Sequence, residues 1–212
     1  VAAHGAGKLA EAARLYRAVL DAAPDHAGAL HLLGVIASQR GRLKEAERLI
    51  DRALAADPAL AAAWSNRGLV LQRAGRAEAA LASFDRALAL RPDFAEALFN
   101  RGVALGDLGR PADALASYDR ALAIRPGYLE ALVNRGAALK ALGRAAAALA
   151  SYDAALALRP DQPAILTNRG NALKDLGRTA EALAAYDRAL ALRPDHAEAQ
   201  NGRGNALMAL RR

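Results

Sequence analysis

The amino-acid sequence predicts an all-α protein built from one pair of helices that recurs along the chain. Proline returns every 34 residues, and because proline cannot continue a helix, each one marks the end of a repeated unit. These prolines are Pro24, Pro58, Pro92, Pro126, Pro160 and Pro194. Two sets of glycines keep the same spacing, one from Gly34 to Gly204 and one from Gly41 to Gly177. A fixed period without insertions is typical of helical-repeat architectures.

Numbering each unit from the third residue after the proline divides the whole chain without a remainder. The full units are 27–60, 61–94, 95–128, 129–162 and 163–196. Residues 1–26 form a partial unit with positions 9–34, and residues 197–212 form a partial unit with positions 1–16. We expect 1–212 to be a single domain in which each unit stacks on the next, since one unit is too small to bury a core alone.

Each unit predicts two helices, helix A and helix B. Helix A should end at the glycine of position 15, where a left-handed residue costs little, and helix B before the proline of position 32. The pairs Asp93–Glu96 and Asp195–Glu198 have the spacing of a capping box, which predicts where the next helix A begins. A glycine at position 8 lies inside helix A, where it costs about 1 kcal/mol relative to alanine. We expect helix B to approach closely there, through its alanine at position 20.

The residues at these repeated positions resemble the tetratricopeptide repeat. Each full unit has a large residue at position 4, Gly at 8, Ala at 20, Ala at 27 and Pro at 32. Position 24, typically aromatic, holds Tyr16, Ile50, Phe84, Tyr118, Tyr152 and Tyr186. The resemblance covers the whole chain and implies a right-handed α-solenoid, a superhelix of antiparallel helix pairs with helix A lining a concave surface. Trp64 and the aromatic residues of position 24 are expected in the core.

Position 7 departs from the family pattern, in which it is a large aliphatic residue. Here it is Leu33 in the first full unit and arginine afterwards, while position 25 is aspartate in every full unit. Pairing within a unit would leave Arg203 without a partner, whereas pairing between units matches every aspartate. The sequence therefore predicts an inter-repeat ladder of Asp51–Arg67, Asp85–Arg101, Asp119–Arg135, Asp153–Arg169 and Asp187–Arg203. Because burying two charges is costly, we expect the ladder to fix the stacking register more than it stabilises the fold.

Sequence patterns for catalysis, metals and cofactors are absent, which predicts a protein that is not an enzyme and needs no cofactor. The chain has no cysteine, and its four histidines lack metal-ligand spacing, so we expect them on the surface or in loops. Asp and Glu recur at fixed positions, where they serve as caps and ladder partners rather than as an acid–base pair.

The net charge of +7 raises the question of nucleic-acid binding. The arginines of positions 16 and 31 lie at the turn edges of the units, so solubility and turn chemistry explain them better. Nucleic acid is therefore an unlikely partner. No apolar run reaches the roughly 18 residues of a membrane span. A bias toward Ala, Leu and Arg, with no targeting segment at the start, predicts a bacterial cytoplasmic protein.

The expected binding surface is the helix-A face, which family members use through positions 2, 5, 6, 9, 12 and 13. Position 6 is Asn66, Asn100, Asn134 and Asn168, and then Gly202. This row resembles the asparagine ladder of O-linked N-acetylglucosamine transferases, whose amides hold the backbone of an extended polypeptide. An amide both donates and accepts, so it can pair with a peptide of any sequence. The alternative is that each asparagine only satisfies a neighbouring helix end.

The candidate peptide-binding residues extend from this row to its neighbours. They are Asn66, Leu69, Phe99, Asn100, Val103, Val133, Asn134, Lys140, Asn168, Asn171, Lys174 and Asn205. The apolar members lie in the middle units, where Phe99 is a candidate hot spot because it is aromatic and expected in the groove. Positions 2 and 5 carry no lysine, which argues against the chaperone-tail specificity known in part of the family.

The sequence thus predicts a scaffold that binds an extended peptide or a partner protein on its concave face. A first alternative is the substrate-recruiting region of a larger enzyme similar to O-linked glycosyltransferases, whose transferase domain would follow Arg212. A second is nucleic-acid binding through the basic edges. The chain starts near a helix B and ends with a helix A, without the polar capping helix usual in the family. Head-to-tail self-association through uncapped ends is therefore a further expectation.

Overall fold

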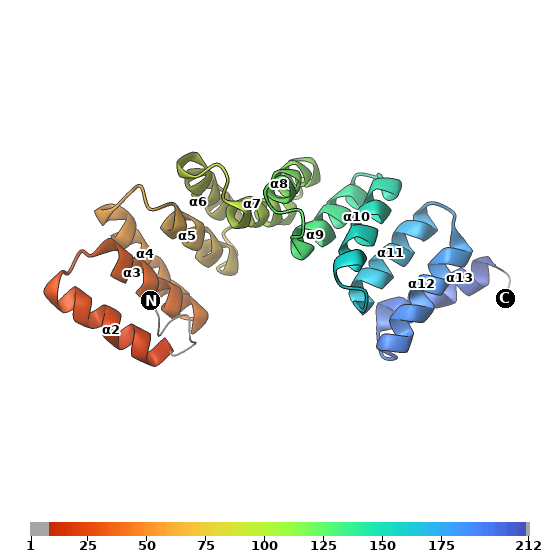
Figure 1. Cartoon of the computed structure of the whole chain (residues 1–212), viewed down its shortest axis with the longest axis horizontal. Coiled ribbons are helices and arrows are strands. Elements are labelled where there is room, and N and C mark those ends of the chain that lie inside the picture. The colour runs from red at the N-terminus through yellow and green to blue at the C-terminus, as the bar shows by residue number, and fades with distance from the viewer. Residues whose placement is uncertain (1–8, 211–212) are drawn as a thin grey trace. The chain divides into compact units, whose positions relative to one another are not determined.

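The computed structural model describes residues 9–210, which contain twelve α-helices and no β-strand (Figure 1). The all-α fold class is confirmed. In chain order the helices are α2 (Leu9–Ala22), α3 (Ala27–Gln39), α4 (Leu43–Ala56), α5 (Ala61–Arg73), α6 (Ala77–Leu90), α7 (Ala95–Asp107), α8 (Pro111–Ile124), α9 (Leu129–Ala141), α10 (Ala145–Leu158), α11 (Pro163–Asp175), α12 (Thr179–Leu192) and α13 (Ala197–Ala209).

The helices follow the repeat register without exception. The odd-numbered helices from α3 to α13 are A helices over positions 1–13, and the even-numbered helices are B helices over positions 17–30. The chain divides into two compact units, Val1–Leu108 and Gly109–Arg212. Within each unit, an A helix packs along the B helix that follows it, as α3 does on α4 and α9 on α10, and each B helix packs on the next A helix. Stacked helix pairs therefore form the core of each unit.

The turn between helices A and B depends on a left-handed glycine, as predicted. Gly41, Gly75, Gly109, Gly143 and Gly177 have φ between 69° and 76°. In the first of these turns the N–H of Gly41 donates to the carbonyl oxygen of Ser38 at 2.9 Å, and the N–H of Arg42 donates to that of Ala37. These bonds satisfy carbonyls that the end of the helix would otherwise leave unpaired.

The predicted capping boxes are wrong. Helix α7 has Phe94 as its N-cap residue and α13 has His196, and neither side chain makes a capping hydrogen bond. The turn after the proline moves the helix start one residue beyond the aspartate, so the carbonyl oxygen of Phe94 accepts from the N–H of Leu98. A side-chain cap exists at α3 instead, where Nδ1 of His26 accepts from the N–H of Ala29 at 3.1 Å.

Where helix B follows, as at Gly34, Gly68, Gly136 and Gly170, the glycine of position 8 is required by its close approach. The nearest contact is the side chain of position 24, and the predicted alanine of position 20 contributes the carbonyl oxygen of Ala46 at Gly34. A Cβ atom at Gly68 would lie 2.5 Å from the ring of Phe84, and one at Gly136 would lie 2.5 Å from Tyr152. The ring at position 24 therefore fills the space that a side chain at position 8 would need. The alanines of position 20 are buried beside it, which lets the two helices come close.

The inter-repeat ladder is confirmed at every rung. The arginine Nε lies 2.5–2.7 Å from an aspartate oxygen in Asp51–Arg67, Asp85–Arg101, Asp119–Arg135, Asp153–Arg169 and Asp187–Arg203. The aspartate side chains are 48–51% exposed, so the expected burial cost is small. Such half-exposed pairs are worth about 0–1 kcal/mol each. Arg67 also donates to the buried Ser83 hydroxyl at 3.0 Å, and thereby links α4, α5 and α6.

Candidate functional site

The helix-A face of the first unit is built by α3, α5 and α7. Asn66 of α5 lies with its amide nitrogen 2.7 Å from Nε2 of His31 on α3. An amide N–H can only donate, so Nε2 must accept and the imidazole is neutral with its proton on Nδ1. His31 is buried, and that burial lowers its pKa. The prediction of a surface histidine is wrong for His31, and Asn66 satisfies a side chain rather than a helix end.

A hollow of about 250 Å³ lies beside Asn66, between α3 and α5. We call it the α3–α5 pocket. Its lining residues are Val35, Ser38, Gln39, Ile50, Asn66, Leu69, Val70 and Arg73. Arg73 is fixed at its edge, because one of its terminal nitrogens donates to the carbonyl oxygen of Ser38 at 2.7 Å and to its hydroxyl at 2.9 Å. The predicted residues Asn66 and Leu69 thus meet in one concavity.

The remaining candidates of the first unit lie on α7, which packs against α5. Phe99, Asn100 and Val103 are all half-buried. Within the described residues the amide of Asn100 has no hydrogen-bond partner, unlike that of Asn66. A contact between the side chains of Gln72 and Asp107, at 2.8 Å, joins α5 to α7 at the C-terminal ends of both helices. Asn100 therefore has a free amide on α7, a helix that the Gln72–Asp107 hydrogen bond connects to α5.

In the second unit the helix-A face is built by α9, α11 and α13. The half-buried residues Val133, Asn134 and Asn168 lie on α9 and α11, with the exposed Lys140 and Lys174 near the C-terminal ends of the same helices. Over residues 9–210, neither these asparagines nor these lysines have a hydrogen-bond or ion-pair partner. This stretch of the face can both donate to and accept from a bound chain.

Asn171 already has two partners in the second unit. Its oxygen accepts from the hydroxyl of Tyr186 at 2.8 Å, and its nitrogen donates to Glu198 at 3.1 Å. Burial raises the pKa of Tyr186 to about 12, with Asp175 and Glu198 adding to the shift. Asn171 therefore ties α11, α12 and α13 together. Asn205, the last candidate, lies exposed on α13.

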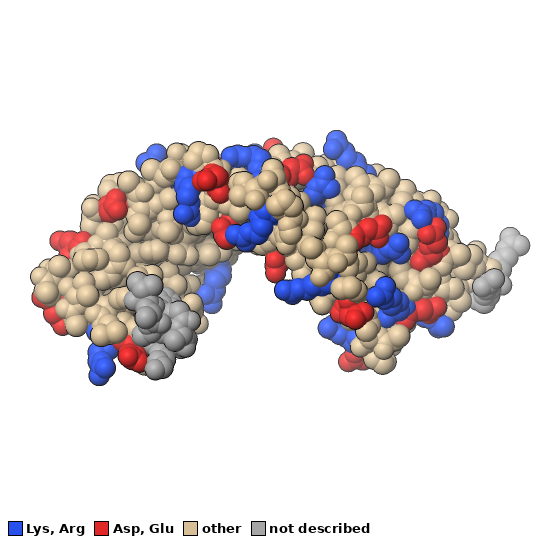
Figure 2. Space-filling model, in the orientation of Figure 1, with Lys and Arg blue, Asp and Glu red and all other residues tan. Residues whose placement is uncertain are grey.

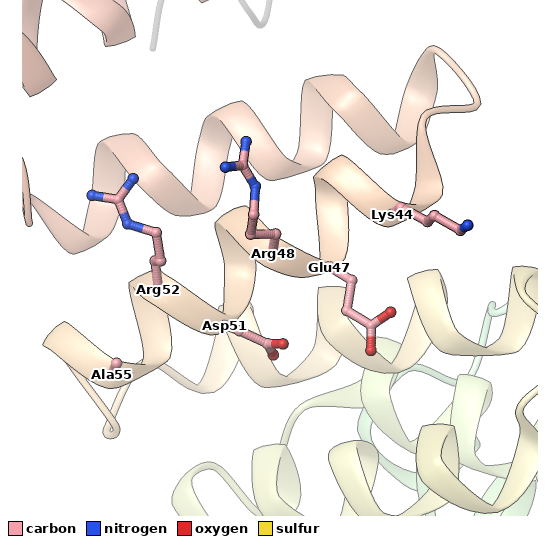
Figure 3. Close-up of a pocket in the computed structure, with 6 residues that line it drawn as sticks. All are labelled: Lys44, Glu47, Arg48, Asp51, Arg52 and Ala55. Atoms are coloured by element: carbon pink, nitrogen blue, oxygen red, sulfur yellow. The ribbon is translucent and has the colours of Figure 1, made fainter.

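A second hollow, of about 530 Å³, lies on the surface of α4 alone (Figure 3). Arg48 and Arg52 point to one side of the helix, while Glu47 and Asp51 point to the other. Both acids belong to ion pairs between repeats, Glu47 with Arg76 and Asp51 with Arg67, each at 2.7 Å. The two acids of this hollow therefore serve the stacking of the helices.

The basic edge formed by position 16 is largely neutralised by neighbouring acids. Ion pairs join Arg42 to Glu45, Arg76 to Glu47, Arg110 to Asp113 and Arg178 to Glu181, at 2.6–2.9 Å. The hydrogen bond from Arg178 lowers the pKa of Glu181. Figure 2 shows basic and acidic side chains interspersed on the visible surface of both units. This pattern favours solubility over a phosphate-binding track.

Among residues 9–210, none of the helices is long and apolar enough to cross a membrane. The same residues contain no group of three or more His, Asp or Glu side chains placed to hold a metal ion.

The regular helix pairs, their glycine-ring packing and a helix-A face with free amides define a helical-repeat scaffold. Comparison with protein-family models identifies the family of helical repeats. Two models described as tetratricopeptide repeat match residues 3–66 and 65–128, and a model described as TPR repeat matches residues 138–177 and 170–210. The chain belongs to the tetratricopeptide-repeat family, whose members are protein-interaction scaffolds. A comparison with curated proteins found no match.

Several solved structures share the fold. YrrB, described as a TPR protein with an unusual peptide-binding site, has a TM-score of 0.81 and 23% identity over 91% of this chain and 99% of its own. PilF of Pseudomonas aeruginosa has a TM-score of 0.85 and 20% identity over 96% and 93%. MamA has a TM-score of 0.75 and 21% identity over 82% and 96%. At these identities the likeness establishes the α-solenoid fold.

The asparagine row stops at Gly202, which packs against a ring of helix α12. A Cβ atom at Gly202 would lie 2.6 Å from the ring of Tyr186. The ring therefore packs directly on the backbone of α13, and a side chain would displace it. Sequence reasoning noted the change from asparagine to glycine at this position but had no signal for the packing that requires it.

Proposed function

We propose that the protein binds extended segments of a partner protein on the helix-A face of each of its two units. The observation that carries the proposal is the set of half-buried amides, Asn100, Asn134 and Asn168, for which the described residues provide no hydrogen-bond partner. A half-buried polar group without a partner is costly unless water or a ligand satisfies it. A peptide backbone offers both donors and acceptors at regular spacing, which suits a row of amides.

Two further observations support this proposal. The α3–α5 pocket and the half-buried Phe99 and Val103 supply apolar surface beside the amides, as hot spots of protein interfaces require. YrrB, which shares the fold, is described as having a peptide-binding site. The proposed role is that of a scaffold without catalysis of its own.

The test is selection from a random peptide-display library on the full chain, followed by affinity measurements on the selected peptides. The informative variant is Asn100→Ala/Asn134→Ala, with Lys44→Ala/Arg48→Ala on the surface of α4 as the matched control. Each lost hydrogen bond is worth about 0.5–1.5 kcal/mol, so the loss of two should weaken binding by roughly 5- to 160-fold. Unchanged affinity in a folded Asn100→Ala/Asn134→Ala variant would place the peptide elsewhere.

A further inference from the structure

The α3–α5 pocket lies beside a substitution that sets its repeat apart. Position 24 is aromatic in every other unit that contains it, but it is Ile50 in unit 27–60. The atoms nearest to a Cβ at Gly68 are ring carbons of Phe84, whereas at Gly34 they are Cγ1 and Cδ1 of Ile50 and the carbonyl oxygen of Ala46. Ile50 is fully buried by its neighbours and yet lines the pocket. At this pocket, therefore, an aliphatic side chain takes the place that a ring occupies in the other repeats.

The size of the pocket restricts what can bind in it. Its volume of about 250 Å³ lies below the range of roughly 300–1,000 Å³ typical of small-molecule and cofactor sites. Its walls are the aliphatic side chains of Val35, Ile50, Leu69 and Val70. A single apolar side chain of a bound peptide matches both the volume and the lining.

The rim of the pocket adds a charge requirement. Arg73 is the one charged residue among the eight that line it. A terminal nitrogen of Arg73 is held by Ser38, while Nε and the other terminal nitrogen have no partner in the described residues. A guanidinium fixed in this way can offer two parallel N–H groups to a carboxylate.

Asn66 supplies the third contact. Its amide nitrogen is committed to His31, which fixes the orientation of the amide and leaves its oxygen available. That oxygen can accept an N–H of a peptide backbone that passes over the pocket. Apolar walls, a fixed cation and an oriented acceptor thus converge on one small concavity.

We propose that the α3–α5 pocket is the anchor site of the peptide groove and takes one leucine-sized aliphatic side chain next to an acidic residue of an extended peptide. The proposal rests on the function proposed above and specifies its ligand. A neighbouring aspartate or glutamate would pair with Arg73, and the intervening backbone N–H with Asn66. All the residues that line the pocket lie in the first unit. The leucine-sized residue of the peptide should therefore bind to the first unit.

The test uses a substitution that should fill the pocket while the chain still folds. The variant Ile50→Phe places the ring of the other repeats over Gly34, and because Phe84 packs over Gly68 in the same way, we expect the variant to fold normally. The matched control is Leu90→Phe, which adds the same volume to a side chain that is 40% exposed on α6. The probe is a Gly/Ser-rich ten-residue peptide with a central Leu-Asp pair, titrated into the isotope-labelled full chain and followed by NMR.

The expected result is a shift of the Asn66 side-chain amide signal in the parent and in Leu90→Phe, and at least tenfold weaker binding to Ile50→Phe. Replacing the peptide Leu by Ala should weaken binding to the parent by a similar factor. Replacing the peptide Asp by Asn should weaken binding to the parent but not to Arg73→Gln. The proposal is overturned if library-selected peptides lose affinity in Asn100→Ala/Asn134→Ala but bind Ile50→Phe as well as the parent, an outcome that leaves the proposed function intact.

Discussion

At the residue scale, the glycines of position 8 differ in what surrounds them. Gly68 is covered by Phe84, whereas a Cβ atom at Gly204 would meet nothing within 4 Å. The two positions are equivalent in the repeat and both lie inside an A helix. Substituting both glycines therefore distinguishes two effects on the free energy of unfolding. One is the cost of any glycine inside a helix, and the other is the cost of adding a side chain against the ring of Phe84.

The first prediction compares these two glycines. Gly68→Ala should lower the free energy of unfolding by about 1–3 kcal/mol, because the added methyl group overpacks the contact with Phe84. Gly204→Ala should raise it by up to about 1 kcal/mol, because alanine favours the helix and has open space. Urea unfolding followed by circular dichroism measures both. Equal effects of the two changes would contradict the packing described for position 8.

The second prediction concerns the buried His31. Burial lowers its pKa in the folded protein, so the folded state keeps the imidazole neutral while the unfolded chain binds a proton near the ordinary value of 6.5. The unfolded state then binds more protons as the pH falls, and stability decreases. We expect the free energy of unfolding to drop between pH 7 and pH 5. The drop should be smaller in His31→Gln, which keeps a hydrogen-bond acceptor but does not titrate. Identical pH profiles would contradict this role.

At the scale of elements, the repeat period was enough to predict every helix in the described chain. Proline and left-handed glycine act locally, so the ends of helices A and B follow from the sequence alone. The capping boxes failed because the turn after proline shifts the helix start by one residue. The His31–Asn66 contact was missed because it joins side chains 35 residues apart. Only the stacking of α3 and α5 brings them together.

The binding face shows the same limit of sequence reasoning. Its positions follow from the register, but the partners of each asparagine do not. Asn66 and Asn171 are engaged with neighbours, whereas Asn100 is free over residues 9–210. The sequence shows that Ile50 stands where the other repeats have an aromatic residue. It does not show how that side chain packs over the glycine, so it could not predict the α3–α5 pocket.

The third prediction tests how α13 is held. Tyr186→Phe removes the hydrogen bond to Asn171, which also binds Glu198 of α13. The loss should cost about 0.5–1.5 kcal/mol and should increase amide exchange in α13 more than in α3. Hydrogen-exchange mass spectrometry resolves the two helices. Tyr16→Phe, which changes the same kind of residue on α2, is the control. Exchange that rises equally in α3 and α13 would contradict the local role of the contact.

At the scale of the whole molecule, the first and last described helices both expose apolar side chains. Helix α2 exposes Leu15 and Val19, at 49% and 38%, and α13 exposes Met208, at 70%, beside the polar residues Gln200 and Asn205. The expected head-to-tail self-association through these helices therefore stays a prediction.

The fourth prediction concerns this self-association. We expect light scattering to give a mass that rises above that of one chain, 22.1 kDa, between about 10 and 200 μM protein. The substitution Gln200→Leu, which places a large apolar residue at position 4 of α13, should strengthen association. A mass of one chain at every concentration would contradict head-to-tail stacking through α2 and α13.

The central claim is that the free amides of the helix-A faces bind a peptide backbone. The most direct measurement is the NMR signal of the asparagine side-chain amides, recorded as a library-selected peptide is added to saturation. We predict that the signals of Asn134 and Asn168, both in the second unit, shift with the same dissociation constant and that the signal of Asn100 in the first unit also shifts, while that of Asn171, held by Tyr186 and Glu198, moves least. Saturating binding that leaves all three amide signals unmoved would contradict the claim.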